Sequence, residues 1–180
     1  MSGAGKSTLS GNVKIRLAEI GIDCEIIDGD DYRKYICKDL GFSKADRMEN
    51  VRRLGFIASK FSSRDIVTII SAICPYDEIR QELVNTYYNV KIVHIDCPTN
   101  KLIERDTKGL YKKALLPEGH PDKINNLTGI NDTYEVPVNP DLYVNTSEND
   151  LNTCVNMLSS FIESYHRKVQ RPQFNVVPEL

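Results

Sequence analysis

The sequence Ser2-Gly3-Ala4-Gly5-Lys6-Ser7-Thr8 lies at the start of the chain and matches most of a phosphate-binding loop, G-x-x-x-x-G-K-[ST]. Its small residues let successive backbone N–H groups curl around a phosphate, and a helix that begins here would point its N-terminus at the anion. The pattern predicts that Lys6 contacts the β- and γ-phosphates and that Ser7 offers its hydroxyl to Mg²⁺. Short strings of this kind also occur by chance, so the rest of the chain has to support the interpretation.

Two parts of the usual pattern are not in the sequence: the first glycine, which would fall one residue before Met1, and the apolar strand that leads into the loop. In a phosphate-loop fold that strand lies in the middle of a parallel sheet. We therefore expect its neighbours to be unpaired and partly exposed, and we expect the sequence to be a truncated reading of a longer protein.

The composition is that of one ordinary globular domain. The chain has 180 residues, of which 41% are hydrophobic and 27% are charged, and its formal net charge is -2. No overall basic field favours nucleic acid, so we expect anion binding to be local. Five scattered cysteines without a C-x-x-C pair indicate reduced thiols rather than a disulfide framework or a zinc site. No apolar run approaches 18 residues, which predicts no membrane partner and a cytoplasmic location.

Helical and strand patterns alternate along the chain. We expect helices over 7–20, 32–40, 43–63, 76–85, 98–105 and 151–166, and strands over 23–27, 66–73, 90–95 and 142–144. The run 66–73 is nearly all apolar, which predicts a strand buried on both faces. The pattern predicts an α/β, P-loop kinase-like fold of three layers with a parallel sheet. The domain would span 1–167, with an irregular tail over 168–180.

The region 106–140 differs in texture, because glycines and prolines interrupt it and lysines are interspersed. A long irregular stretch in a compact domain is usually functional, so we expect a mobile lid here. Arg105 and Lys108 stand at its base, where closure could bring positive charge to a transferring phosphoryl group.

Acidic residues follow the strand predicted at 23–27, at the end where ligands bind in open α/β sheets. Asp30 could accept a proton from an acceptor hydroxyl or hold Mg²⁺ through water. Asp28 could do the same or cap a helix. Arg33 and Arg47 come next, and the pair Arg52 and Arg53 fits either an anion site or a solvated helix face.

Several blocks in the right order show that the sequence resembles the adenylylsulfate kinase family, from Ser2 to about Val144. Besides the phosphate loop, the matching blocks are Asp28-Gly29-Asp30 with Arg33, Lys38-Asp39-Leu40-Gly41-Phe42-Ser43, Ala45-Asp46-Arg47, Glu49-Asn50-Val51-Arg52-Arg53, Pro75-Tyr76, Arg105-Asp106, Lys108-Gly109-Leu110-Tyr111-Lys112-Lys113-Ala114, Thr128-Gly129-Ile130 and Tyr134-Glu135.

The resemblance implies ATP-dependent phosphorylation of the 3′-hydroxyl of adenosine 5′-phosphosulfate (APS), in sulfate assimilation, with ATP and Mg²⁺ as cofactors. It implies a homodimer as well, since the family is often dimeric. The implied catalytic residues are Asp30, Lys6, Arg105 and Lys108. ATP would contact Gly3, Ala4, Gly5, Lys6, Ser7, Thr8 and Arg105, and Mg²⁺ would lie at Ser7 and Asp30. The implied acceptor site comprises Asp28, Arg33, Arg47, Asn50, Phe61, Ile73, Lys108 and Leu127, with Phe61 stacked on the base.

Three positions depart from the family pattern. Cys74 stands where the family usually has serine, and with no histidine nearby in the sequence it is better explained as a packed thiol than as a nucleophile. Asp77 replaces a common arginine. Leu127 replaces a phenylalanine that covers the adenine, which forfeits stacking worth about 1 to 3 kcal/mol.

The departures and the missing strand leave two further interpretations open. A related branch phosphorylates cytidine diphosphoramidate in capsule synthesis, and a one-sided stack would suit that smaller base. A catalytically disabled nucleotide-binding module is the other alternative.

Overall fold

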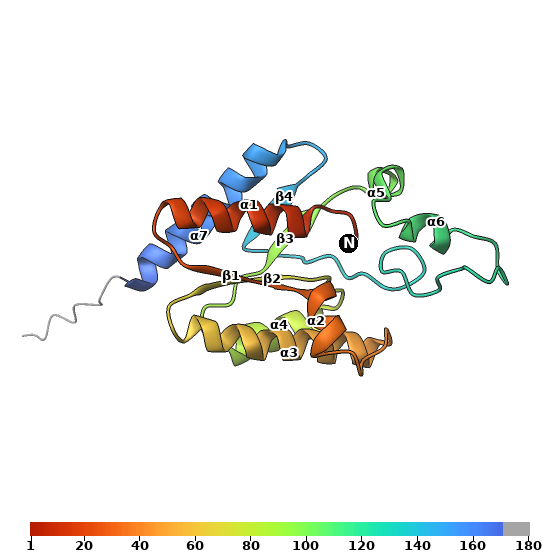
Figure 1. Cartoon of the computed structure of the whole chain (residues 1–180), viewed down its shortest axis with the longest axis horizontal. Coiled ribbons are helices and arrows are strands. Elements are labelled where there is room, and N and C mark those ends of the chain that lie inside the picture. Colours follow the sequence, from red (N-terminus) through yellow and green to blue (C-terminus); the bar gives the residue numbers. More distant parts are fainter. Residues whose placement is uncertain (171–180) are drawn as a thin grey trace, which may run out of the picture.

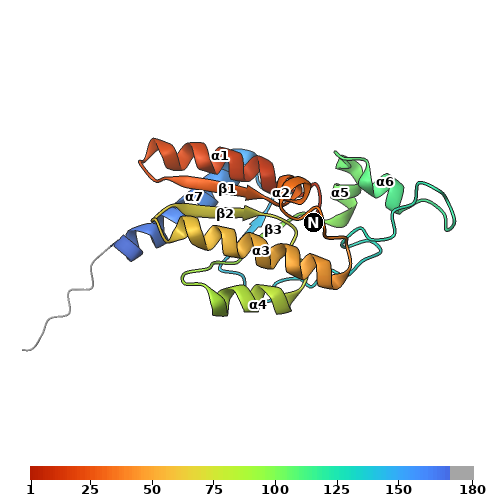
Figure 2. The ribbon, with the colours of Figure 1, turned by 60° about the horizontal axis from the view of Figure 1, so that its bottom comes forward.

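The computed structural model describes residues 1–170, and its elements form three layers around parallel strands (Figure 1). Helices α1 (Lys6–Glu19) and α7 (Leu151–Gln170) cover one face of the strands, and α3 (Lys44–Ser62) and α4 (Asp77–Thr86) cover the other (Figures 1 and 2). The α/β architecture predicted from the sequence is confirmed. Of the tail predicted over 168–180, the backbone of 168–170 continues α7, and the rest lies outside the described residues.

The remaining elements follow in the predicted alternation. They are β1 (Cys24–Asp28), α2 (Gly29–Tyr35), β2 (Val67–Ser71), β3 (Val93–Asp96), α5 (Thr99–Arg105), α6 (Leu110–Ala114) and β4 (Leu142–Asn145). Helix α2 starts and ends earlier than the predicted 32–40, because the Asp28 carboxylate accepts a hydrogen bond from the Asp30 backbone N–H and caps the helix there. The region predicted as a lid contains the short helix α6, and α5 and α6 lie to one side of the layers (Figure 1).

The strands form two separate parallel pairs among the described residues. Strand β1 pairs with β2, from Cys24 opposite Val67 to Asp28 opposite Ser71, and β3 pairs with β4, from Val93 opposite Leu142 to Asp96 opposite Asn145. The edges of β2 and β3 that face away from these partners have no ladder in residues 1–170.

A cavity of about 520 Å³ lies between the two strand pairs. It is lined by residues 67–72, by Val93 and Ile95 of β3, and by Leu9 of α1 and Phe161 of α7. Only Ser71 of β2 is buried, so the expectation of a strand buried on both faces is wrong for its other residues. The reason is that these residues border the cavity on the side of β2 that faces away from β1, where no strand pairs with β2 in residues 1–170.

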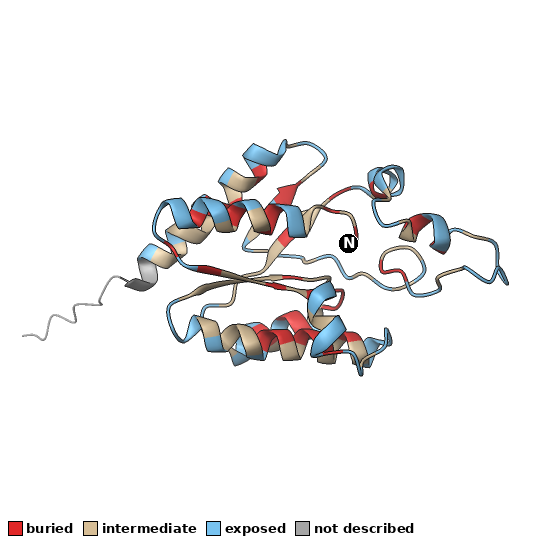
Figure 3. Ribbon diagram, in the orientation of Figure 1, coloured by how far each residue is buried: buried red, intermediate tan, exposed pale blue. Residues whose placement is uncertain are grey.

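The hydrophobic core has three parts, and Figure 3 colours the buried residues of the helices and strands red. The first packs α1 against α7 and the strands through Leu9, Val13, Leu17, Val144 and Leu158. The second joins the phosphate loop to α5 and α6 through Ala4, Leu102, Tyr111 and Leu127, and the third packs α3 on α4. Because each fully buried aliphatic side chain contributes about 1.5 to 3 kcal/mol, the second part ties the loop firmly to the base of the lid region.

Candidate nucleotide-binding active site

The phosphate loop has the backbone conformation that its glycines permit. Gly3 and Gly5 have φ values of 71° and 90°, in the left-handed region that favours glycine, and α1 begins at Lys6 directly after them. The Lys6 ammonium folds over the loop and donates to the Met1 carbonyl oxygen at 2.6 Å. Burial lowers the pKa of Lys6 from 10.5 to about 8, although Asp30 works in the opposite direction. A partly buried cation at a helix N-terminus makes this a site for an anion.

Oxygen donors gather beside the loop at the end of β1. The Ser7 hydroxyl donates to Asp28 Oδ2 at 2.7 Å and lies 3.5 Å from the Ser71 hydroxyl. Burial would raise the pKa of Asp28, but the hydrogen bonds from Ser7 and from the α2 backbone outweigh it and lower the pKa. Asp28 therefore caps α2, which is one of the two roles that the sequence left open, and it also accepts a hydrogen bond from Ser7.

Lys108 and Asp30 form an ion pair across the site. The two residues are 78 positions apart in the sequence, and the pair joins the base of the lid region to the start of α2. Both side chains are more than half exposed. The pair can therefore open at little cost when a ligand enters.

The lid base also rests on the phosphate loop through polar contacts. Tyr111 is buried and its hydroxyl donates to the Ser2 carbonyl oxygen at 2.9 Å, while burial raises its pKa to about 12. Arg105 donates to the Thr146 carbonyl oxygen at 3.0 Å, and the Thr146 hydroxyl lies 3.1 Å from the Ala4 carbonyl oxygen. Arg105 is thus held next to the loop, as its predicted place at the ATP side requires.

A second group of predicted residues lies near α2 and the start of α3. Arg47 is buried, donates to the Phe42 and Asn126 carbonyl oxygens at 3.0 and 2.6 Å, and lies 2.9 Å from an Asp132 carboxylate oxygen. Burial and the neighbouring Arg47 lower the pKa of Arg33. Two guanidinium groups held close together favour an anionic ligand between them.

Asn50 supports the same interpretation. Its side chain is buried one turn after Arg47, and its Oδ1 has no hydrogen-bond partner among residues 1–170. A buried polar atom without a partner is costly, so a bound donor would satisfy it. Ile73, also predicted at the acceptor, is half-buried two residues after the end of β2.

The structure does not bring Phe61 to this group. It lies 14 residues after Arg47 on α3, which corresponds to about 21 Å along the helix axis. The aromatic ring beside Arg33 and Arg47 is that of Phe42, whose centroid lies 4.7 and 5.4 Å from their guanidinium carbons. Phe42 is 51% exposed. Phe42 directly precedes Ser43, whose side chain caps α3, and this place at a helix start is the signal in the sequence that could have identified it.

The departures from the family pattern also have definite positions. Leu127 is buried in the second part of the core. Cys74 is half-buried, and burial raises its pKa to about 11, which fits a packed thiol. Asp77 pairs with the buried Arg80 at 3.1 Å.

The glycine-containing loop before α1 ends in Lys6 and Ser7, and Ser7 contacts the Asp28 carboxylate at the end of β1. These features define a P-loop kinase. In the acceptor region, Arg33 and Arg47 further indicate a kinase whose acceptor is an anion. The sequence model of the family described as "Adenylylsulphate kinase" matches residues 1–145, so the chain belongs to this family. No helix among residues 1–170 is both long and apolar enough to cross a membrane.

Individual relatives agree with this assignment. An adenylyl-sulfate kinase of Synechococcus sp. (strain JA-3-3Ab) is 39% identical over 165 residues, which cover 92% of this chain and 91% of the relative. One of Deinococcus deserti is 44% identical over 146 residues, covering 81% and 78%. The structure of the Mycobacterium tuberculosis APS kinase CysC in complex with AMPPNP and APS superposes with a TM-score of 0.83 at 34% identity, covering 91% and 93%.

Proposed function

We propose that this protein transfers the γ-phosphoryl group of ATP to the 3′-hydroxyl of APS, which yields 3′-phosphoadenosine 5′-phosphosulfate and ADP. The observation that carries the proposal is the pairing of Asp30 with Lys108 between two anion sites, the phosphate loop and the Arg33–Arg47 pair. Its relative from M. tuberculosis was solved with AMPPNP and APS together, which supports two nucleotides in one site.

On the ATP side, the phosphates would occupy the loop formed by residues 2–8. Lys6 would leave the Met1 carbonyl oxygen and contact the β- and γ-phosphates, and Arg105 would lie against the nucleotide. The oxygens of Ser7, Asp28 and Asp30 suit Mg²⁺, which binds through few protein ligands plus water and phosphate. When bound, Mg²⁺ would neutralise charge on the transferred group.

On the acceptor side, Arg33 and Arg47 would hold the phosphosulfate, Asn50 Oδ1 would accept a hydrogen bond, and the base would lie on the Phe42 ring. Asp30 would accept the proton of the 3′-hydroxyl as it attacks in line. Opening of the Lys108–Asp30 ion pair would free the carboxylate for that step and move the ammonium toward the developing phosphoryl charge.

A second candidate acceptor is cytidine diphosphoramidate. The burial of Leu127 in the core favours it, because the base would then be covered from one face only, by Phe42. A smaller pyrimidine loses less from a missing second stacking partner than adenine does.

A side-by-side assay of ADP release with the two acceptors tests the proposal. We expect Mg²⁺-dependent turnover of APS, and a decrease in kcat of at least about 10²-fold in Asp30→Asn, since general-base catalysis contributes 10² to 10⁴. If only cytidine diphosphoramidate were turned over, it would be the acceptor in place of APS. ATP binding without turnover of either would support the disabled module. A homodimer and a cytoplasmic location also stay predictions, testable by light scattering and by fractionation.

A further inference from the structure

The segment 36–42, which we call the acceptor loop, joins α2 to α3 and carries Phe42. Three arginines donate hydrogen bonds to its backbone carbonyl oxygens. Arg33 bonds Leu40 and Gly41, at 3.3 and 2.9 Å, and Arg47 bonds Phe42 at 3.0 Å. Arg53 bonds Ile36, at the start of the loop, at 3.2 Å.

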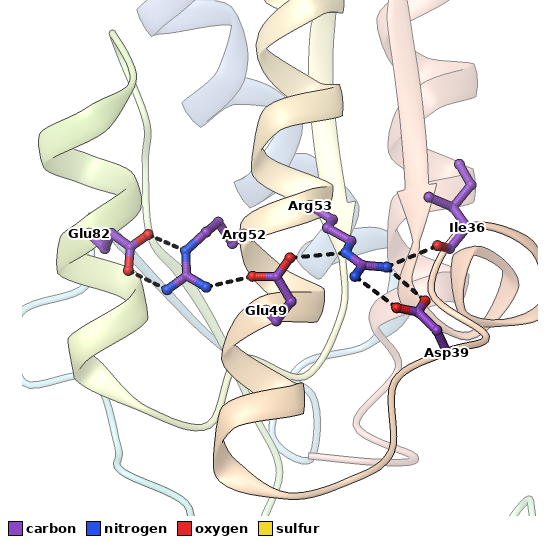
Figure 4. Close-up of polar contacts among 6 residues, drawn as sticks. All are labelled: Ile36, Asp39, Glu49, Arg52, Arg53 and Glu82. Atoms are coloured by element: carbon purple, nitrogen blue, oxygen red, sulfur yellow. Dashed lines mark hydrogen bonds and ion pairs between the residues drawn. The ribbon is translucent and has the colours of Figure 1, made fainter.

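Arg53 holds the acceptor loop through its side chain as well (Figure 4). Its two terminal nitrogens each lie 2.8 Å from an oxygen of the Asp39 carboxylate, and its Nε donates to Glu49 at 3.0 Å. The paired contact with Asp39 sets both distance and orientation, because the planar guanidinium matches the carboxylate.

The Glu49 carboxylate connects Arg53 to a second, similar contact. Its other oxygen accepts a hydrogen bond from Arg52 at 2.7 Å, and Arg52 makes a two-pronged pair with Glu82 of α4 at 2.6 and 2.8 Å (Figure 4). The acceptor loop, α3 and α4 are therefore joined by one chain of alternating charges. Arg53 faces the loop, and Arg52 faces away from it.

Arg53 lies further along α3 than Arg47 and Asn50, the two acceptor residues that this helix carries. It comes six residues after Arg47, which is about 9 Å along the axis and about 120° away around it. A bound phosphosulfate would compete for the donors of Arg33 and Arg47, which would then hold the loop less well. Arg53 would keep all of its contacts with Ile36 and Asp39.

We propose that Arg53 is a positioning residue of the acceptor site, which anchors the acceptor loop so that Phe42 and the Arg33 guanidinium face the acceptor nucleotide. This inference rests on the proposed function, because it assigns Phe42 and Arg33 to acceptor binding. Arg53 acts through the loop and contacts neither substrate.

The test compares Arg53→Gln with Arg52→Gln, which breaks the same network on the side of α4. We expect the KM for the acceptor to rise about tenfold in Arg53→Gln, within the 10²-fold that a misplaced group can cost, with the KM for ATP unchanged. Arg53→Lys should restore part of the loss, because it keeps the charge without the paired geometry. Asp39→Asn, at an exposed side chain, should reproduce the effect without threatening the fold.

Hydrogen exchange of residues 36–42 gives a readout that needs no substrate. We expect faster exchange in Arg53→Gln and Asp39→Asn than in Arg52→Gln, each with its unfolding midpoint measured. Equal exchange in all three, or equal changes in both KM values, would overturn the proposal. If the wild type turned over neither acceptor, the proposed function would fail, and the exchange comparison would still decide whether Arg53 anchors the loop.

Discussion

Replacement of Lys6 by methionine is expected to stabilise the ligand-free protein while it abolishes phosphoryl transfer. Lys6 is partly buried, and the one hydrogen bond that its ammonium makes within residues 1–170 is to the Met1 carbonyl oxygen of its own loop. Burial lowers its pKa from 10.5 to about 8, so the folded chain holds the charged form less well than the unfolded chain does.

The shift in the pKa of Lys6 sets the size of the expected change in the free energy of unfolding. At 1.36 kcal/mol for each pKa unit, a change from 10.5 to about 8 corresponds to about 3 kcal/mol of lost stability below pH 8. Between pH 8 and 10.5, Lys6 has lost its proton in the folded state but keeps it in the unfolded state. The free energy of unfolding therefore rises with pH across that window. Loss of the hydrogen bond to Met1 offsets about 1 kcal/mol, which leaves a gain of about 2 kcal/mol at pH 7.

Denaturant unfolding of wild type and Lys6→Met, at pH 7 and through pH 8 to 10.5, measures both quantities. Lys14→Met is the matched control, because Lys14 lies on the same helix with a half-exposed side chain, and we expect a change within about 0.5 kcal/mol. A Lys6→Met protein no more stable than wild type, or one that kept the wild-type rise with pH, would refute the reasoning.

Three further changes test other parts of the structure. Ser43→Ala removes the hydroxyl that accepts from the Asp46 backbone N–H at the start of α3, and should lower the unfolding free energy by about 1 kcal/mol; Ser43→Asp, which can still cap, should not. Gly29→Ala places a methyl group 2.8 Å from the Ala72 Cβ, so it should cost about 1 to 3 kcal/mol and lower kcat by shifting the start of α2; an unchanged melting temperature would contradict this. Fusing an apolar strand-forming segment before Met1 should raise the melting temperature by filling the cavity of about 520 Å³ between β2 and β3, whereas a glycine-serine segment of equal length should not.

The local elements could be predicted from the sequence because their signals are local. Apolar residues at helical spacing predicted α1 and α3, and apolar runs predicted β2 and β3. The phosphate loop and its glycines were predicted for the same reason, since a left-handed turn at Gly5 is a property of a few neighbouring residues. The order of the blocks along the chain further indicated the adenylylsulfate kinase family, which the comparisons bear out.

The tertiary structure changed two predictions about the site, those for Phe61 and Asp28. The family resemblance placed Phe61 on the base, but the length of α3 puts Phe61 far from Arg47, and the ring beside Arg47 is that of Phe42. For Asp28 the sequence left open a proton acceptor or magnesium ligand and a helix cap; the structure shows the cap, together with a hydrogen bond from Ser7 that the sequence did not indicate.

By itself, the sequence determined the class of fold, the phosphate loop with Lys6 and Ser7, and the family. Only the tertiary structure decided which distant groups meet: Lys108 with Asp30 across 78 positions, Phe42 with two arginines, and Arg53 with the acceptor loop. The physical reason is that backbone periodicity is set by residues within a turn or two. Contacts between charges and rings depend on helix lengths, crossover connections and packing, which no short stretch of sequence contains.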